Sequence, residues 1–197
     1  MFELLIGLLC CFVMMGSLFT YLKIISKKYY DGKDPSSLSN TFYKTGWKFR
    51  VLLVWMCLLL IYPVLLANGI YTSGGWLYYA PYTLLSWSKL AFAICMGGLI
   101  GVAMNADFQK TEEKPHMTAA IAFAAGGGIL GCTLRHEWYV GVGVIVAWLL
   151  YYLWKQYKNS KAGNPNAFDL YLELVAFYSV PTCLVIYMLM NYFFLSK

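Results

Sequence analysis

Six long apolar runs constrain this chain more than any other feature of its sequence. A transmembrane helix needs about 20 mainly apolar residues to cross about 30 Å of hydrocarbon. These runs are apolar on all sides, whereas the strands of a membrane barrel alternate apolar and polar residues. The sequence therefore predicts an all-α integral membrane bundle of about six transmembrane helices. The predicted spans are 4–25, 51–68, 82–105, 117–134, 139–154 and 172–195.

The scarcity of charge supports the same fold class. Hydrophobic residues make up 60% of the 197 residues and charged residues only 12%, against about 25% charged residues in soluble domains. A chain with so little polar surface cannot coat a water-soluble globule, so the lipid bilayer is its expected solvent. We expect a single transmembrane domain over 1–197. Nucleic acid is not an expected partner, because no folded basic domain is present to bind it.

Lysine and arginine are concentrated in alternate connections. Seven fall in the last turn of the first span and its connection to the second (23–50), two between spans three and four and three between spans five and six, whereas the opposite side has two. Cytoplasmic connections carry this excess in membrane proteins. We therefore expect both termini on the non-cytoplasmic side of a bacterial inner (plasma) membrane.

The connection at 26–50 contains a second kind of helix. Asp34 stands at a typical helix start, followed by proline and short polar side chains that can act as caps. Leu38, Phe42 and Phe49 recur at helical spacing, and lysines lie on the other face. This pattern predicts a short amphipathic interfacial helix at the membrane surface. It can serve only to anchor the bundle, or it can dock a soluble partner.

One ionisable residue well inside a predicted span is the clear functional candidate. Lys89 follows the start of span three by seven residues, which places it about 10 Å deep at 1.5 Å per residue, and Ser86 and Ser88 flank it. An intramembrane charge is a functional hypothesis by default. Lys89, Ser86 and Ser88 are therefore the candidate cavity or ligand residues. The alternative is that the lysine extends its ammonium to the headgroups.

Small residues recur four apart in spans three and four. Gly97 and Gly101 form one such pair, and Gly127 and Gly131 form another. Small residues at this interval let helix backbones approach closely in lipid. These four glycines are the candidate helix-packing residues. They predict either packing within one bundle or a homo-oligomer.

The sequence indicates no catalytic, cofactor-binding or metal site. His116 and His136 lie at opposite ends of span four, so they cannot share a metal ion within one chain, and zinc sites generally need three or four close ligands. The six cysteines fall inside predicted spans without metal-ligand spacing. Asp169 and Glu173 lie near the start of span six, where acidic side chains favour the helix dipole. An enzymatic role is therefore not favoured.

Two short stretches carry a resemblance to a known group of proteins. The sequence SLSNTFY at 37–43, together with Pro115-His116 at the start of span four, resembles uncharacterised small bacterial or phage six-span membrane proteins. The resemblance implies the same topology and no activity, and no functional residue is carried over from it.

Three function classes fit these observations. The leading hypothesis is a non-enzymatic channel, pore or transport-type protein that acts as an oligomer. The second is a membrane scaffold or accessory subunit that docks a partner through the 26–50 connection. The third, an intramembrane lipid-modifying enzyme, needs several convergent ionisable groups at depth, whereas the spans offer mainly Lys89.

Overall fold

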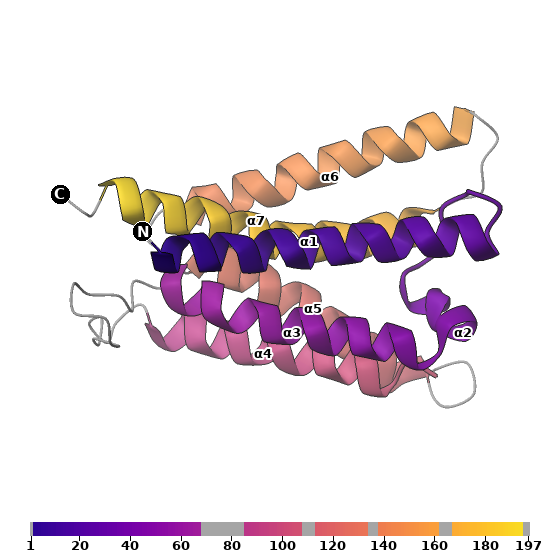
Figure 1. The fold of residues 1–197 in the computed structure, drawn as a ribbon, viewed down its shortest axis with the longest axis horizontal. Coiled ribbons are helices and arrows are strands. Elements are labelled where there is room, and N and C mark those ends of the chain that lie inside the picture. The colour runs from indigo at the N-terminus through magenta and orange to yellow at the C-terminus, as the bar shows by residue number, and fades with distance from the viewer. Residues whose placement is uncertain (1, 68–84, 108–112, 134–137, 162–166, 195–197) are drawn as a thin grey trace.

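Six long helices make up most of the structure, a computed structural model that describes residues 2–67, 85–107, 113–133, 138–161 and 167–194. Each is long and apolar enough to cross a membrane, and no strand occurs among the described residues. The predicted all-α bundle is confirmed, and the chain is a polytopic integral membrane protein. The long helices are α1 (Phe2–Tyr29), α3 (Trp47–Ala67), α4 (Leu85–Met104), α5 (Glu113–Thr133), α6 (Trp138–Lys161) and α7 (Phe168–Phe194) (Figure 1).

Two helices continue past the apolar runs that predict them. The first run ends at residue 25 and α1 at Tyr29, whereas the fifth run ends at residue 154 and α6 at Lys161. In both helices the added turn carries lysines. Positive side chains stabilise the negative end of a helix dipole, and the helix can continue once it has left the hydrocarbon.

Between α1 and α3 the chain forms a segment that we call the strap, residues 30–46. It contains the short helices η1 (Ser39–Thr41) and α2 (Phe42–Thr45). Gly46 ends α2 with a φ of 57°, a conformation that glycine adopts without steric cost, so the amphipathic segment before α3 is divided in two. Leu38 of the strap and Phe49 of α3, both from the predicted apolar face, are 1% and 0% exposed. They pack into the protein, so the strap is held by the bundle itself.

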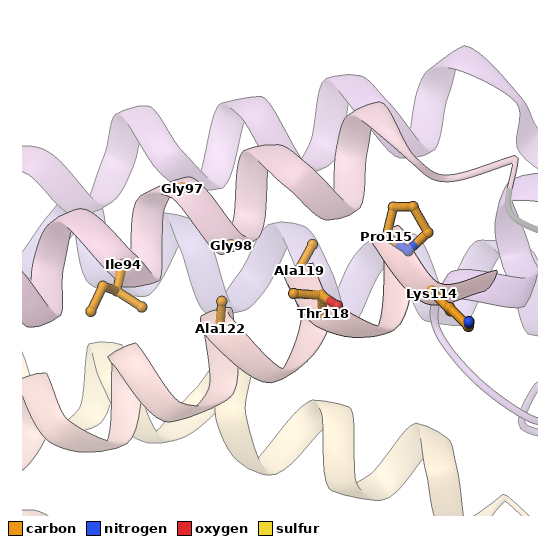
Figure 2. A pocket seen from close by; sticks show the side chains of 8 residues that line it. All are labelled: Ile94, Gly97, Gly98, Lys114, Pro115, Thr118, Ala119 and Ala122. Atoms are coloured by element: carbon orange, nitrogen blue, oxygen red, sulfur yellow. The ribbon is translucent and has the colours of Figure 1, made fainter. Parts of the chain in front are cut away.

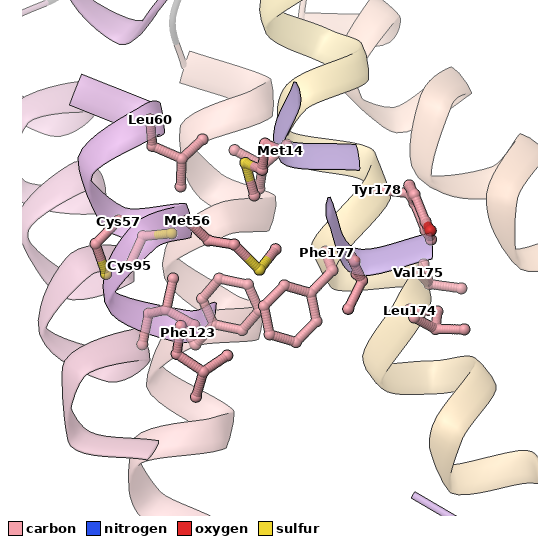
Figure 3. Packing of buried hydrophobic residues seen from close by; sticks show 14 of the residues in the cluster. Met14, Met56, Cys57, Leu60, Cys95, Phe123, Leu174, Val175, Phe177 and Tyr178 are labelled. Carbon is pink, nitrogen blue, oxygen red and sulfur yellow. The ribbon is translucent and has the colours of Figure 1, made fainter. Parts of the chain in front are cut away.

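The centre of the bundle is filled by apolar side chains. α7 contacts four other long helices, α1, α3, α5 and α6. At mid-height the rings of Phe123 on α5 and Phe177 on α7 lie 4.5 Å apart between centroids, next to Met56 of α3 (Figure 3). Met14 and Leu60 continue the same buried cluster. Dense packing of this kind is typical of protein interiors.

The strap defines one end of the bundle. α1 begins and α7 ends together at the opposite end, while the last turns of α1 and α6 lie at the same end as the strap (Figure 1). We call this the strap end. The lysines of those two last turns, which are Lys27, Lys28, Lys158 and Lys161, therefore gather there with the lysines of the strap.

Candidate functional site

The three residues predicted around a cavity do not share one environment. Ser88 is 2% exposed, whereas the adjacent Lys89 is exposed, so the two side chains face different surroundings. The side chain of Ser86 lies outside the described residues. Since α4 begins at Leu85, Lys89 is about 6 Å from that helix end at 1.5 Å per residue. An exposed lysine so close to a helix end can extend its ammonium to the headgroups.

The four predicted packing glycines face three different surroundings. A Cβ added at Gly101 would lie 2.8 Å from the side chain of Ala119 on α5. A Cβ at Gly127 or Gly131 would meet side chains of α7, at 2.8 and 3.2 Å. A Cβ at Gly97 would have nothing within 4 Å. Three of these glycines therefore serve contacts within the bundle, and Gly97 lies on open surface.

The closest approach of α4 and α5 uses two other glycines. A Cβ at Gly98 would lie 2.3 Å from the backbone nitrogen of Phe123, and one at Gly126 would lie 2.5 Å from that of Cys95. The contact is reciprocal, because each glycine faces the backbone of the other helix. Only small residues allow backbones to approach so closely in lipid.

A polar cluster at the strap end joins the strap to α6 and α7. Asp34 of the strap forms an ion pair with Lys155 of α6, with 2.8 Å between Oδ2 and Nζ. The hydroxyl of Tyr171 on α7 donates a hydrogen bond of 2.6 Å to the same oxygen. Asn159 donates to the Tyr171 hydroxyl at 2.5 Å. Lys155 Nζ also lies 4.9 Å from the centroid of the Tyr171 ring, so one carboxylate holds two helices together.

The electrostatics of Asp34 reflect these donors. Burial alone would raise the pKa of the Asp34 carboxyl. The hydrogen bonds from Lys155, Tyr171 and Asn159, and the charge of Lys155, outweigh that effect and hold the pKa below its ordinary value. The ionised form of Asp34 is therefore the one that fits this cluster.

A second acidic side chain fixes the middle of the strap. Glu173 of α7 accepts hydrogen bonds from the backbone N–H of Leu38 and from the Ser39 hydroxyl, the latter at 3.2 Å. Leu170 N–H, one of the N-terminal amides of α7 that lack a partner within the helix, donates to the carbonyl of Ser36 at 3.0 Å. Buried backbone groups need hydrogen-bond partners. α7 provides a partner for a strap amide, and the strap provides a partner for an amide at the start of α7.

The other side of the strap is held by α1. The hydroxyl of Tyr21 lies 2.8 Å from Oγ1 of Thr41 and 2.8 Å from Oγ1 of Thr45. Thr41 is fully buried. With Asp34 and Glu173, this third anchor gives the strap a defined position across α1, α6 and α7.

Asp34 and Glu173 belong to this site, although their positions in the sequence predict other roles. Asp34 stands at a typical helix start, and Glu173 lies near a helix N-terminus where an acid is stabilised by the dipole. Of the two, only Glu173 could have been identified from the sequence as a candidate site residue. It lies inside the sixth span, and an ionisable residue inside a span is a functional hypothesis by default.

A shallow groove runs along the outer face of α4 and α5. Its volume is about 690 Å³. Gly97 and Ala122 leave it open in the middle, and Lys114 lies at one end (Figure 2). The groove is predominantly apolar and faces outward, so it offers a surface contact to lipid or to another helix, and no enclosed chamber for a reaction.

The histidines and cysteines do not assemble a metal site within the described part of the chain. No group of three His, Cys, Asp or Glu side chains suited to a metal ion occurs there. His116 is 4% exposed, and its Nδ1 lies 3.0 Å from the Asn105 carbonyl oxygen. This contact links the start of α5 to the end of α4. His136 lies outside the described residues.

Comparison with protein-family models, curated proteins and solved structures finds no match to this chain. The function therefore has to be argued from the geometry of the bundle and its strap end.

Proposed function

We propose that the protein is a membrane scaffold or accessory subunit that binds an acidic soluble partner at its strap end. The observation that carries this proposal is the opposite orientation of the acids and bases there. Asp34 turns inward to Lys155 and Glu173 turns to the strap backbone. All seven bases between residues 23 and 50 remain exposed, namely Lys23, Lys27, Lys28, Lys33, Lys44, Lys48 and Arg50.

This arrangement gives a cationic surface that is already ordered. Asp31 is the one exposed acid between residues 23 and 50, so little negative charge offsets the bases. Complementary charge accelerates the association of an acidic partner and selects it over basic ones. The anchors at Tyr21, Asp34 and Glu173 fix the strap before binding, which reduces the ordering cost of a complex.

The packed interior supports a scaffold more than a conduit through one chain. Leu18 of α1, Met56 of α3 and Leu184 of α7 are fully buried in one continuous apolar cluster. A path through the middle of the bundle would have to displace such side chains.

An acidic probe tests the proposal with the full-length protein in nanodiscs of phosphatidylcholine. The probe is a fluorescent poly-glutamate peptide, and its binding is followed by fluorescence anisotropy at rising salt. We expect saturable binding that weakens with salt and is lost in the triple variant Lys33→Gln, Lys44→Gln, Lys48→Gln. Glu173→Leu should also weaken binding, because it releases the strap without changing its lysines.

The matched control is the double variant Lys158→Gln, Lys161→Gln, which removes strap-end charge from α6 only. The proposal fails if this control weakens binding as much as the triple variant does per charge removed. It also fails if hydrogen exchange shows a released strap in Glu173→Leu while probe binding is unchanged.

An oligomeric channel or transport role is the second candidate, and one observation favours it. The α4–α5 groove is kept open by Gly97, which gives a second copy room to pack closely. Conduction would then use the interface between copies. Ion flux into liposomes, compared between wild type and Lys89→Met, tests it. Equal flux in both, together with a monomer in nanodiscs, would contradict this role.

A further inference from the structure

A second apolar groove lies between α6 and α7. Its volume is about 670 Å³. The small residues Gly143 and Ala147 line the groove on α6. A Cβ at Gly143 would have nothing within 4 Å. Gly143 and Ala147 are exposed, so the groove is open to the surrounding lipid along α6. In Figure 1, α6 lies at an angle to the rest of the bundle.

An ordered aromatic side chain forms the floor of this groove. The Trp148 ring stacks on Tyr178 and Tyr152, with centroid distances of 5.0 and 5.8 Å. Its indole N–H donates to Oγ1 of Thr182 at 3.1 Å, and Thr182 in turn donates to the Tyr178 carbonyl at 2.7 Å. The Trp148 indole N–H and the Thr182 hydroxyl are thus already hydrogen-bonded, so this part of the groove presents an apolar surface to its occupant.

The same face of α6 becomes cationic beyond the groove. At steps of three or four residues, which keep to one helix face, the face runs from Ala147 through Tyr151 and Trp154 to Lys158. Lys158 Nζ lies 4.3 Å from the Trp154 ring centroid. Lys161 repeats this arrangement over Tyr157 at 4.6 Å. No acidic residue occurs between 138 and 161.

The part of the groove nearest the strap end fits within one leaflet. From Gly143 to Tyr151 the α6 wall is about 12 Å long at 1.5 Å per residue. Half of the hydrocarbon thickness is about 15 Å. An acyl chain that lies along this wall therefore has its headgroup near Trp154 and Lys158, where aromatic rings and lysines suit the interface.

We propose that the α6–α7 groove binds one anionic phospholipid, with an acyl chain along Gly143, Ala147 and Trp148 and the phosphate held by Lys158 and Lys161. Apolar shape alone would accept any lipid chain, and the paired lysines select the anionic headgroup. The α4–α5 groove has a single lysine, Lys114, beside the acidic Glu113 in the sequence. This site differs from the strap surface, which is formed by the exposed bases between residues 23 and 50, and does not depend on it.

Native mass spectrometry of the full-length protein tests the site with dioleoyl phosphatidylglycerol and, for comparison, dioleoyl phosphatidylcholine. We expect one tightly retained phosphatidylglycerol and no equivalent phosphatidylcholine. In Lys158→Gln, Lys161→Gln that lipid should bind about 25-fold more weakly, taking about 1 kcal/mol per lysine near an anionic headgroup and 1.4 kcal/mol per tenfold change. Lys23→Gln, Lys27→Gln removes equal charge from α1 and should change binding little.

The groove itself is tested by filling it. Gly143→Leu should abolish retention, whereas Gly97→Leu, which fills the α4–α5 groove at a position equally free of neighbours, should leave it unchanged. A diazirine-tailed phosphatidylglycerol in nanodiscs should crosslink to α6 between residues 143 and 151. The proposal is overturned by equal retention of both lipids, by crosslinks confined to α4 and α5, or by equal effects of the two glycine variants. Displacement of the lipid by glycerol 3-phosphate alone would also overturn it.

Discussion

At Asp34, one carboxylate oxygen accepts hydrogen bonds from a lysine on α6 and a tyrosine on α7. Glu173 makes the same kind of contact from α7, because its carboxylate accepts hydrogen bonds from a backbone amide and a hydroxyl of the strap. Both carboxylates therefore stabilise contacts within the protein. The consequence is a strap whose contacts to α6 and α7 join residues more than one hundred positions apart in sequence, with its lysines left to the surface.

Asp34→Asn should destabilise the protein at neutral pH. The folded-state pKa of Asp34 lies below its ordinary value, so the stabilisation is complete above the unfolded pKa of about 3.9 and is lost as the pH falls through the folded pKa. Hydrogen bonds to charged groups contribute about 1.5–3 kcal/mol, and partial exposure of the pair reduces this to about 1 kcal/mol. Thermal unfolding in nanodiscs at several pH values measures the effect.

The difference between wild type and Asp34→Asn should be present at neutral pH, should begin to shrink as the pH falls below about 3.9, and should vanish only below the folded-state pKa. Asp31→Asn is the matched control, since Asp31 is exposed. A difference that persists unchanged to low pH would show that packing, and not the charge, gives Asp34 its effect.

At the scale of elements, the helices were predictable and their contacts were not. Apolar runs of sufficient length are a local property of the sequence, and all six runs coincide with long helices. The partner of a residue depends instead on the rotation of its helix. Successive residues are about 100° apart around a helix with 3.6 residues per turn. Gly97 and Gly98 therefore face open surface and the α5 backbone, respectively, although they are adjacent in sequence and only Gly97 has a small residue four positions away.

The candidate site was hidden for a related reason. The contact between Leu38 and Glu173 joins positions 135 residues apart, and no local pattern records such a pairing. The strap itself was visible as an amphipathic segment. Its apolar face was expected at the membrane surface, but hydrogen-bond partners on α1 and α7 hold it against the bundle. Periodicity identifies which side chains seek an apolar environment, and only the tertiary fold decides whether lipid or protein supplies it.

Adjacent glycines of α4 should respond in opposite ways to alanine. In Gly98→Ala the new Cβ meets the backbone of Phe123 at 2.3 Å, so α4 and α5 must separate, at a cost of about 1–3 kcal/mol or more for overpacking. In Gly97→Ala the Cβ meets nothing, and the better helix propensity of alanine contributes up to about 1 kcal/mol of stability. Thermal unfolding of both variants in the same detergent measures this. Equal destabilisation would mean that Gly97 is covered in solution, as a second copy would cover it.

At the scale of the whole molecule, an even number of spanning helices returns the chain to the side where it began. α1 begins and α7 ends at one end of the bundle, and the strap lies at the other (Figure 1). The connections at the strap end are also those that hold twelve lysines and arginines, against two in the connections and tail of the opposite side. Among the described residues, the fold thus brings to one end of the bundle basic side chains from separate stretches of sequence.

This asymmetry predicts that the strap end faces the cytoplasm and that both termini lie outside. Basic connections are retained on the cytoplasmic side during insertion, and each lysine near an anionic leaflet adds about 1 kcal/mol of attraction. The test uses a protein whose six cysteines are replaced by alanine, with Ser160→Cys or Phe2→Cys added, since both positions are exposed. A membrane-impermeant maleimide should label Phe2→Cys in intact cells and Ser160→Cys only after permeabilisation. Labelling of Ser160→Cys in intact cells, with Phe2→Cys protected, would reverse the orientation and place the strap surface outside, beyond the reach of any cytoplasmic partner.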